Sequence, residues 1–238
     1  MRLGVWAMAL CLAGSVNAIE VNTLFAVAND DGVAMLTLNN DQQERLYVNV
    51  SMAALHVEEG QLVETPYNRS NVLEWEIEVK PSQVVVNPGF ERDFKVQLKC
   101  GQACDRTTDQ VYQVSLLPVP HFPDRPPGSS LGMVFGFAPV IMMPGEERPL
   151  DYHIEYRADG TLWVENYSTN YMRLKIEACE GGEISRDCTA EYTVLGGRHL
   201  ALPLTERLAK LQLAVTLETH RASYRDTQVL TRGKQHEG

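Results

Sequence analysis

Hydrophobic and polar residues alternate in short runs along most of this chain. Between positions 74 and 79, glutamate occupies every second position, and Trp75, Ile77 and Val79 occupy the others. Such alternation is typical of a β-strand with one buried and one solvated face. Similar runs, rich in Val, Ile, Thr, Tyr and Phe, recur with turn signals about every ten residues, a spacing typical of β-sandwiches. The pattern therefore predicts an all-β protein.

The alternating runs fall into two groups, separated by a polar, proline-bounded segment at Pro144–Pro149. In the first group we expect strands at Glu20–Ala28, Val33–Asn39, Leu46–Met52, Val72–Val79, Gln83–Asn87, Phe94–Leu98, Tyr112–Leu117 and Leu131–Met143. In the second group we expect strands at Tyr152–Tyr156, Thr161–Glu165, Met172–Ala178, Tyr192–Leu195, His199–Leu202, Leu211–Leu217 and Ala222–Leu230. Only Thr205–Leu211 has helical character. The grouping predicts a first domain at 19–144, a linker at 145–149 and a second domain at 150–238, each of ordinary domain size.

The start of the chain has the organisation of a secretory signal peptide. Arg2 supplies a positive charge, Leu3–Gly14 form an apolar core, and Val16–Ala18 form a small-residue cleavage site. We expect residues 1–18 to be removed after Ala18 and the remainder to be exported. The apolar core is too short to cross a membrane, so no membrane insertion is expected. The formal net charge of −10 argues against a nucleic-acid partner, because phosphate binding needs a basic face.

Four cysteines follow the predicted cleavage site, an even number that suits an oxidising compartment. Their spacing favours two local disulfides, Cys100–Cys104 and Cys179–Cys188, one in each predicted domain. A zinc site is the alternative. However, a Cys-x3-Cys pair that is distant from the second pair and has no nearby histidine is a poor zinc pattern. We expect no metal site.

Gly128–Pro144 carries no charged residue, although 22% of the chain is charged. Within it, Leu131, Met133, Phe135 and Phe137 alternate as the apolar face of a strand would. Edge strands are normally protected by charge, because an unpaired apolar edge recruits other chains. The segment is therefore either fully buried or serves to lend its edge to another polypeptide.

No arrangement of residues in the sequence predicts catalysis. Gly128–Gly132 matches G-x-S-x-G, but that hydrolase motif needs a strand before its serine and a helix after it. Here two prolines precede the motif and a strand pattern follows it. The six histidines are scattered, and the chain has no glycine-rich phosphate loop. We expect no enzyme activity, no catalytic residue and no cofactor.

Several segments resemble periplasmic pilus-assembly chaperones. Pro81–Val96, PSQVVVNPGFERDFKV, is similar to that family's proline-glycine segment, and Tyr112–Pro120, YQVSLLPVP, to the strand that follows it. Ile19–Asp41 fits the family's opening hairpin. The second half, from Tyr152–Tyr156 to its cysteine pair, looks closest to chaperones of the alternative chaperone/usher type, which serve common-pilus and colonisation-factor fimbriae. The resemblance covers essentially the whole chain after residue 18.

The resemblance implies two immunoglobulin-like sandwiches in an L- or boomerang-shaped arrangement, located in the periplasm. It also implies the partners, which are pilin subunits and an outer-membrane usher, with self-association possible when no subunit is bound. Pilin subunits lack the last strand of their fold, and the chaperone lends one of its own by donor-strand complementation. By position, the side chains that would fill the subunit's groove are Leu131, Met133, Phe135, Phe137 and Val140. The alternate residues would pack inward, and these are Gly132, Val134, Gly136 and Ala138.

The family's usual carboxylate anchor is missing from this sequence. The best-known members hold the subunit's terminal carboxylate with an arginine on the first strand and a lysine on the donor strand. Here the arginine position falls at Leu24 and the lysine position near Pro139. No Lys or Arg occurs between Arg125 and Arg148. The sequence leaves open whether another basic residue or main-chain N–H groups hold the carboxylate.

Two rival interpretations belong to other classes of protein. A structural pilus subunit or adhesin would lack a strand, whereas two complete sandwiches are predicted here. A secreted carbohydrate-binding module would need an exposed aromatic platform. Trp75 and Trp163 lie in strand patterns and are predicted to be core residues.

Overall fold

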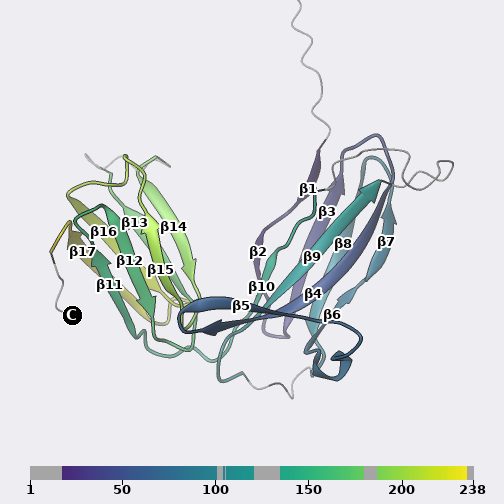
Figure 1. Cartoon of the computed structure of the whole chain (residues 1–238), viewed down its shortest axis with the longest axis horizontal. Helices are drawn as coiled ribbons and strands as arrows, with labels where there is room; N and C mark the ends of the chain where they lie inside the picture. The colour runs from purple at the N-terminus through teal and green to yellow at the C-terminus, as the bar shows by residue number, and fades with distance from the viewer. Residues whose placement is uncertain (1–17, 101–103, 105, 121–134, 180–186, 235–238) are drawn as a thin grey trace, which may run out of the picture.

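The computed structural model describes residues 18–100, 104, 106–120, 135–179 and 187–234. Across this part of the chain the structure is built from β-strands, with one short 3-10 turn, η1 (Val72–Glu74). The strands form two sandwiches, which lie close together at the lower end of Figure 1 and diverge towards the upper end. The predictions of an all-β protein and of a boomerang-shaped arrangement are confirmed.

The first sandwich consists of a four-stranded and a six-stranded sheet. The four-stranded sheet has the order β1 (Ile19–Val21), β3 (Val33–Asn40), β8 (Phe90–Leu98), β6 (Ile77–Lys80). The six-stranded sheet, called the β9 sheet below, has the order β2 (Phe25–Val27), β10 (Val140–Met143), β9 (Gln110–Pro120), β4 (Leu46–Glu58), β5 (Gln61–Pro66), and β7 (Gln83–Val86) also pairs with β4. Leu36 and Phe94 from one sheet share a fully buried core with Leu116 and Ile141 from the other.

The second sandwich consists of a three-stranded and a four-stranded sheet. The three-stranded sheet has the order β11 (Tyr152–Tyr156), β12 (Thr161–Asn166), β15 (His199–Pro203). The four-stranded sheet, called the β13 sheet below, has the order β14 (Thr189–Val194), β13 (Met172–Glu177), β16 (Gln212–Glu218), β17 (Arg225–Thr231). Tyr156 and Leu162 face Leu174 and Val215 in its core.

Most expected strands are present, and the differences have physical causes. Glu20–Ala28 is not one strand, since β1 and β2 are separate and pair in different sheets. β5 was not predicted, because it is exposed along its whole length and has no buried face to produce a pattern. Val72–Val79 is not one strand, since η1 occupies its first part and β6 begins only at Ile77. Thr205–Leu211 forms turns rather than a helix. Of Leu131–Met143, residues 131–134 lie outside the described residues.

Both sandwiches contain the same buried asparagine turn. Asn40, at the end of β3, donates through its side-chain amide to the carbonyls of Glu44 and Val86, at 2.9 and 3.1 Å. Asn166, at the end of β12, donates in the same way to the carbonyls of Asn170 and Val194, both at 2.9 Å. In each case the side-chain oxygen accepts the N–H of the residue two positions later. Each asparagine thus satisfies main-chain groups that a turn at the end of a sandwich would otherwise leave unpaired.

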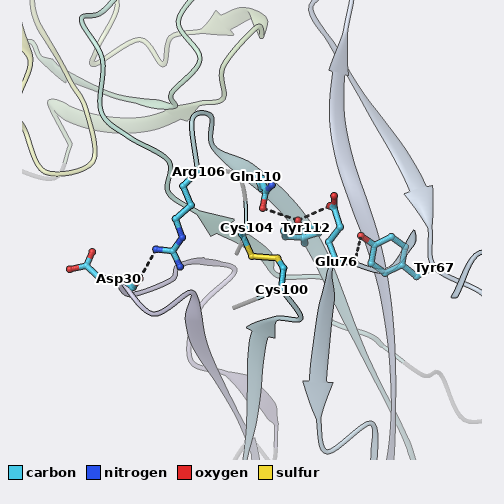
Figure 2. Close-up of a disulfide and its surroundings, with 8 residues drawn as sticks. All are labelled: Asp30, Tyr67, Glu76, Cys100, Cys104, Arg106, Gln110 and Tyr112. Carbon is cyan, nitrogen blue, oxygen red and sulfur yellow. Dashed lines mark hydrogen bonds between the residues drawn. A yellow bond between two sulfur atoms is a disulfide. The ribbon is translucent and has the colours of Figure 1, made fainter. Parts of the chain in front are cut away.

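Both predicted disulfides are present, one in each sandwich. Cys100–Cys104 closes the loop that leads from β8 to β9 (Figure 2). Near it, the hydroxyl of buried Tyr112 donates to a carboxylate oxygen of Glu76 at 2.8 Å. Burial, followed by this hydrogen bond, raises the pKa of Tyr112 well above its ordinary value. The phenol therefore stays protonated, and it ties β9 to the residue just before β6.

Asp109, just before β9, joins the two sandwiches. One carboxylate oxygen accepts the N–H of Gly145 at 2.7 Å and the side-chain amide of Asn170 at 3.0 Å. The other oxygen accepts the N–H of Tyr171 at 2.7 Å. Because hydrogen bonds to a carboxylate are stronger than neutral ones, these three contacts fix the connection between β10 and β11 against the second sandwich.

The β4–β5 hairpin makes a second contact between the sandwiches. At its tip, the carbonyl of Gly60 accepts the N–H of His199 at 3.1 Å and a guanidinium N–H of Arg198 at 3.2 Å. Gly60 has a φ of 76°, and a Cβ at this position would lie 2.4 Å from the His199 ring. Only glycine therefore allows this approach. Two separated contacts restrict the hinge between the sandwiches more than either would alone.

The asparagine turn predicts a position-specific loss of stability. Asn40→Ala leaves the buried carbonyl of Val86 without its donor, and we expect the free energy of unfolding to fall by about 2–3 kcal/mol. Asn39→Ala, one residue earlier, removes only an exposed side-chain contact to Asp41 and should cost less than about 0.5 kcal/mol. Urea unfolding of both variants measures the difference. Equal losses would show that the turn is not held by this amide.

The Asp109 contacts predict coupled unfolding of the two sandwiches. Asp109→Ala removes two hydrogen bonds to the second sandwich and one to the connecting segment, and we expect roughly 3 kcal/mol of coupling to be lost. Calorimetry should then resolve two transitions where the parent protein has one, and X-ray scattering should give a broader distance distribution. Asp93→Ala, which removes an exposed hydrogen bond to Thr37 within the first sandwich, is the matched control. A variant with unchanged scattering and a single transition would contradict this role.

Candidate functional site

Residues 135–143 run antiparallel to β9 along one side of the β9 sheet. β10 pairs with the start of β9, from Val140 opposite Gln113 to Met143 opposite Gln110. The chain before β10 continues the pairing through a single bridge, in which Phe137 and Leu116 exchange both main-chain hydrogen bonds at 2.7 and 2.9 Å. The whole described segment is therefore held to β9.

Only part of this segment is covered on its other side. β2 runs parallel to β10, from Phe25 beside Val140 to Val27 beside Met142. The covering ends at Leu24, whose carbonyl accepts the N–H of Val140 at 2.9 Å. The residues before Val140 have no neighbouring strand on that side within the described chain.

The main-chain groups of Gly136 and Ala138 point to this uncovered side. Because successive residues in a strand direct their N–H and C=O groups to opposite sides, the pairing of Phe137 with β9 turns those of its neighbours outward. Neither Gly136 nor Ala138 makes a hydrogen bond to any residue that the structure describes. We call the uncovered side of residues 135–139 the open edge.

Pro139 does not weaken the open edge. Its carbonyl accepts the N–H of Val114 at 3.0 Å, so its main-chain groups face β9. The missing proline N–H therefore removes a donor from the ladder with β9 and none from the open edge. The outward donors and acceptors of Gly136 and Ala138 are intact.

The structure separates the five predicted donor-strand residues. Leu131 and Met133 lie outside the described residues. Phe135 is 67% exposed at the start of the described segment. Phe137 is half-buried and packs on the core of the first sandwich, and Val140 is half-buried within β10. Their role toward a subunit stays a prediction, with Phe135 the most accessible of the three described residues.

The two faces of the segment differ from the expected ones. Gly136 and Ala138 were expected to pack inward, but both are exposed. Phe137 contacts the core instead, because it lies directly opposite Leu116, and cross-strand partners project to the same face. Leu116 is completely buried, so Phe137 points towards the core as well.

Two apolar side chains near the open edge were not identified from the sequence. Leu117 is 45% exposed, and a Cβ on Gly136 would lie 3.3 Å from its side chain. Leu24, at the position of the family's arginine, is 63% exposed where the covering by β2 ends. A signal for Leu117 existed, since one of two successive leucines in a strand must face outward. The site therefore combines exposed apolar side chains with main-chain groups that bond to none of the described residues.

Other features bear on what the chain could do. The G-x-S-x-G match at Gly128–Gly132 and the predicted signal peptide, apart from Ala18, lie outside the described residues. Among the residues that the structure describes, no group of His, Cys, Asp or Glu side chains is arranged to hold a metal ion. No helix within the described ranges is long and apolar enough to cross a membrane.

Comparisons with known proteins agree with this geometry. The model of the family described as CS5 fimbrial protein N-terminal domain matches residues 21–144, more than half of the chain. No curated protein matches the chain in sequence.

Several solved structures share the fold at low sequence identity. A class 5 fimbriae chaperone, CfaA, superposes with a TM-score of 0.55 at 13% identity, covering 90% of this chain and 99% of CfaA. A structure of the Salmonella enterica SafA pilin with the SafB chaperone gives 0.54 at 15% identity, with 92% and 99% covered. The CsuC–CsuE chaperone–tip adhesion subunit complex of Acinetobacter baumannii gives 0.53 at 10% identity, with 91% and 100% covered.

These superpositions cover both sandwiches and confirm the resemblance in fold to chaperones of chaperone–usher systems. They also identify the two sandwiches as immunoglobulin-like, as the resemblance implied. The match to residues 21–144 covers the first sandwich from the last residue of β1 onward. The chain belongs to the CS5 fimbrial protein family.

Proposed function

We propose that this chain is a periplasmic chaperone that caps pilin subunits by donor-strand complementation and delivers them to an outer-membrane usher. The observation that carries the proposal is the open edge, where Gly136 and Ala138 direct outward main-chain groups that are unpaired within the described residues, beside exposed Phe135. An extended strand can add to such an edge through main-chain hydrogen bonds, while side chains that project from the edge fill pockets in the partner.

Chaperones with the same fold support this proposal. One similar structure is titled a periplasmic chaperone, SfaE, and others are titled complexes of a chaperone with a pilin or a tip subunit. We infer the same compartment and the same class of partner for this chain. The usher as the receiving partner, and removal of residues 1–18 during export, are part of the same proposal.

The rival carbohydrate-binding module has less support. Trp75 stacks on Tyr67, with ring centroids 5.8 Å apart, and Arg157 lies 4.4 Å from the centroid of the Trp163 ring. Each indole is half-buried, rather than fully buried as the sequence suggested, and offers a face to a neighbouring side chain of the same chain. These rings are therefore poorly placed to form a free aromatic platform.

The proposal predicts that a charge on Phe135 abolishes partner binding. Phe135→Glu would place a carboxylate in the partner's apolar groove without a counter-ion, and we expect a loss of affinity of about a hundredfold or more. The test is co-purification with a pilin subunit encoded beside the gene, together with a thermal melt. Phe90→Glu is the matched control, because Phe90 is 63% exposed on the other sheet of the first sandwich. If both variants retain the subunit equally well, Phe135 is not part of the binding site.

The proposal also predicts a main-chain effect at Ala138. Ala138→Pro removes an outward N–H without removing a hydrogen bond to β9, so the fold should change little while the added strand loses a donor. We expect subunit retention to fall by about tenfold, with a small change in melting temperature. Ala138→Ser keeps the N–H and should behave like the parent protein. Equal retention by both variants would contradict strand addition at this edge.

A further inference from the structure

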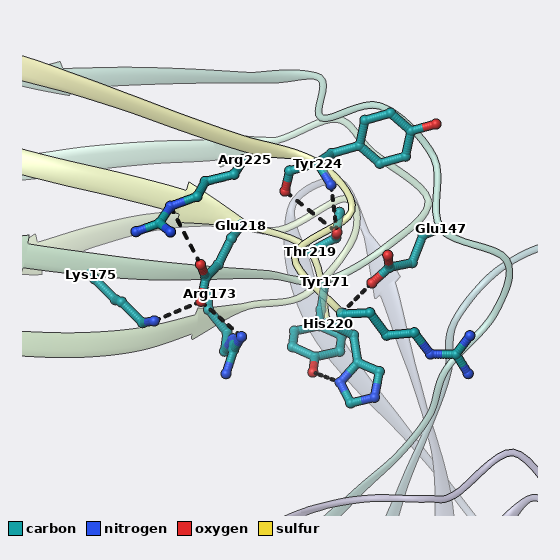
Figure 3. Close-up of polar contacts among 10 residues, drawn as sticks. Glu147, Tyr171, Arg173, Lys175, Glu218, Thr219, His220, Tyr224 and Arg225 are labelled. Atoms are coloured by element: carbon teal, nitrogen blue, oxygen red, sulfur yellow. Dashed lines mark hydrogen bonds and ion pairs between the residues drawn. The ribbon is translucent and has the colours of Figure 1, made fainter.

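A compact group of cations surrounds one buried carboxylate on the β13 sheet (Figure 3). Glu218, at the end of β16, accepts a hydrogen bond from Lys175 at 2.6 Å and lies 2.8 Å from an amino nitrogen of Arg173. Arg225 approaches the other carboxylate oxygen at 3.7 Å. We call Arg173, Lys175 and Arg225 the basic cluster.

The basic cluster carries more positive charge than Glu218 neutralises. Three cations surround one carboxylate, in a chain whose formal net charge is −10. Glu147 and Glu191 lie in the same region, but neither forms an ion pair with the cluster among the residues that the structure describes. The Nε of Arg173 is buried and has no hydrogen-bond partner in the described chain. That buried atom is out of reach of an added anion, whereas Arg225, 60% exposed and only 3.7 Å from Glu218, is the cation most accessible to one.

Glu218 organises the cluster rather than competing as a titrating group. Its hydrogen bond with Lys175, together with the charges of Arg173 and Arg225, lowers the pKa of the Glu218 carboxyl below its ordinary value. It is therefore ionised at neutral pH and holds the three cations in place. A preorganised set of cations binds an incoming carboxylate with less loss of side-chain entropy than free side chains would.

The basic cluster lies on the outer face of the β13 sheet, at the end of β13 that adjoins the first sandwich. Met172 and Leu174 point into the core, so Arg173 points to the opposite face, as does Tyr171 two residues earlier. The Tyr171 ring packs edge-on against Phe25, with centroids 5.9 Å apart. Because residues two apart in a strand are about 7 Å apart, Arg173 lies one such step from the first sandwich.

The contact between Phe25 and Tyr171 connects the cluster to the open edge. Phe25 is the first residue of β2, and Leu24 before it marks the place where β2 begins to cover β10. A strand added along the open edge must end or turn at Leu24, because β2 already occupies the edge beyond it. At that point Phe25 contacts the buried ring of Tyr171, which lies two residues before Arg173.

We propose that the basic cluster binds a carboxylate of the polypeptide that occupies the open edge. This inference rests on the proposed function, and it adds the second sandwich to the binding surface. Arg173 and Arg225 flank Glu218 in register on β13 and β17 and present guanidinium groups that match a carboxylate's geometry. The carboxylate is supplied by either an acidic side chain or the last residue of the partner.

The alternative is that the cluster only stabilises the second sandwich. In that case its charges would matter for unfolding and not for binding. Arg225 separates the two possibilities best, since its side chain is 60% exposed and lies farthest from Glu218. Removing its charge should leave the fold intact.

The test compares Arg225→Gln and the double variant Arg173→Gln/Arg225→Gln with Arg157→Gln. Arg157 is the matched control, because it lies over the Trp163 ring on the other sheet of the second sandwich. The probe is the pilin subunit encoded beside the gene, and retention is measured over a range of salt concentrations. We expect about a tenfold loss of affinity for the double variant, a smaller loss for Arg225→Gln, and a weaker salt dependence for both. Arg157→Gln should behave like the parent protein.

The source of the carboxylate is identified on the partner. Extending the subunit by two glycines displaces its terminal carboxylate, whereas Asp→Asn and Glu→Gln changes in its last strand remove side-chain carboxylates. Each altered subunit is tested against the parent protein and against the double variant. If a change removes the carboxylate that the cluster holds, the two proteins should bind that subunit equally well.

Failure of this inference can be distinguished from failure of the proposed function. If Arg225→Gln and the double variant retain the subunit with unchanged affinity and salt dependence, while Phe135→Glu loses it, the basic cluster is structural only. If Phe135→Glu also retains the subunit, the proposed function itself is wrong. Should the double variant fail to fold, an unchanged affinity of Arg225→Gln alone overturns the inference.

Discussion

The pairing of Phe137 with Leu116 is the interaction on which the candidate site depends. By using both main-chain groups of Phe137 towards β9, it turns those of Gly136 and Ala138 to the outside. The same pairing sends the Phe137 ring to the core of the first sandwich. If a partner strand adds to this edge, as proposed, the main-chain groups that it meets are already oriented by the pairing with β9, which lowers the ordering cost of binding.

β2 covers residues 135–143 only from Val140 onward, so the open edge ends at that residue. The chain achieves this by placing β1 in one sheet and β2 in the other, so that the first strand changes sheets near Leu24. On the proposed function, a partner strand would end next to the contact between Phe25 and Tyr171. The second sandwich begins at that contact, so the angle between the sandwiches would then affect binding.

Several contacts hold that angle, among them an ion pair between Arg221 and Asp30. Asp109 holds the connecting segment through charge-assisted hydrogen bonds, and the β4–β5 hairpin reaches across with Gly60 at its tip. Burial raises the pKa of Tyr171 to about 12, so its hydroxyl remains neutral where the sandwiches meet. Hydrogen bonds to the Asp109 carboxylate and the Gly60 carbonyl, and the contact between the Phe25 and Tyr171 rings, therefore all contribute to the junction.

The sequence by itself determined the all-β class, the two groups of strands and both cysteine pairings, because alternation and short cysteine spacing are local signals. It also pointed to the charge-free segment that contains Phe135 and Phe137. Only the tertiary structure decided which face of that segment is buried, because strand periodicity is the same for both faces and the register with β9 chooses between them. Local patterns could not predict β5, since a fully exposed strand has no alternation of buried and exposed residues. They could not predict the basic cluster either, since Arg173, Glu218 and Arg225 meet only across three paired strands.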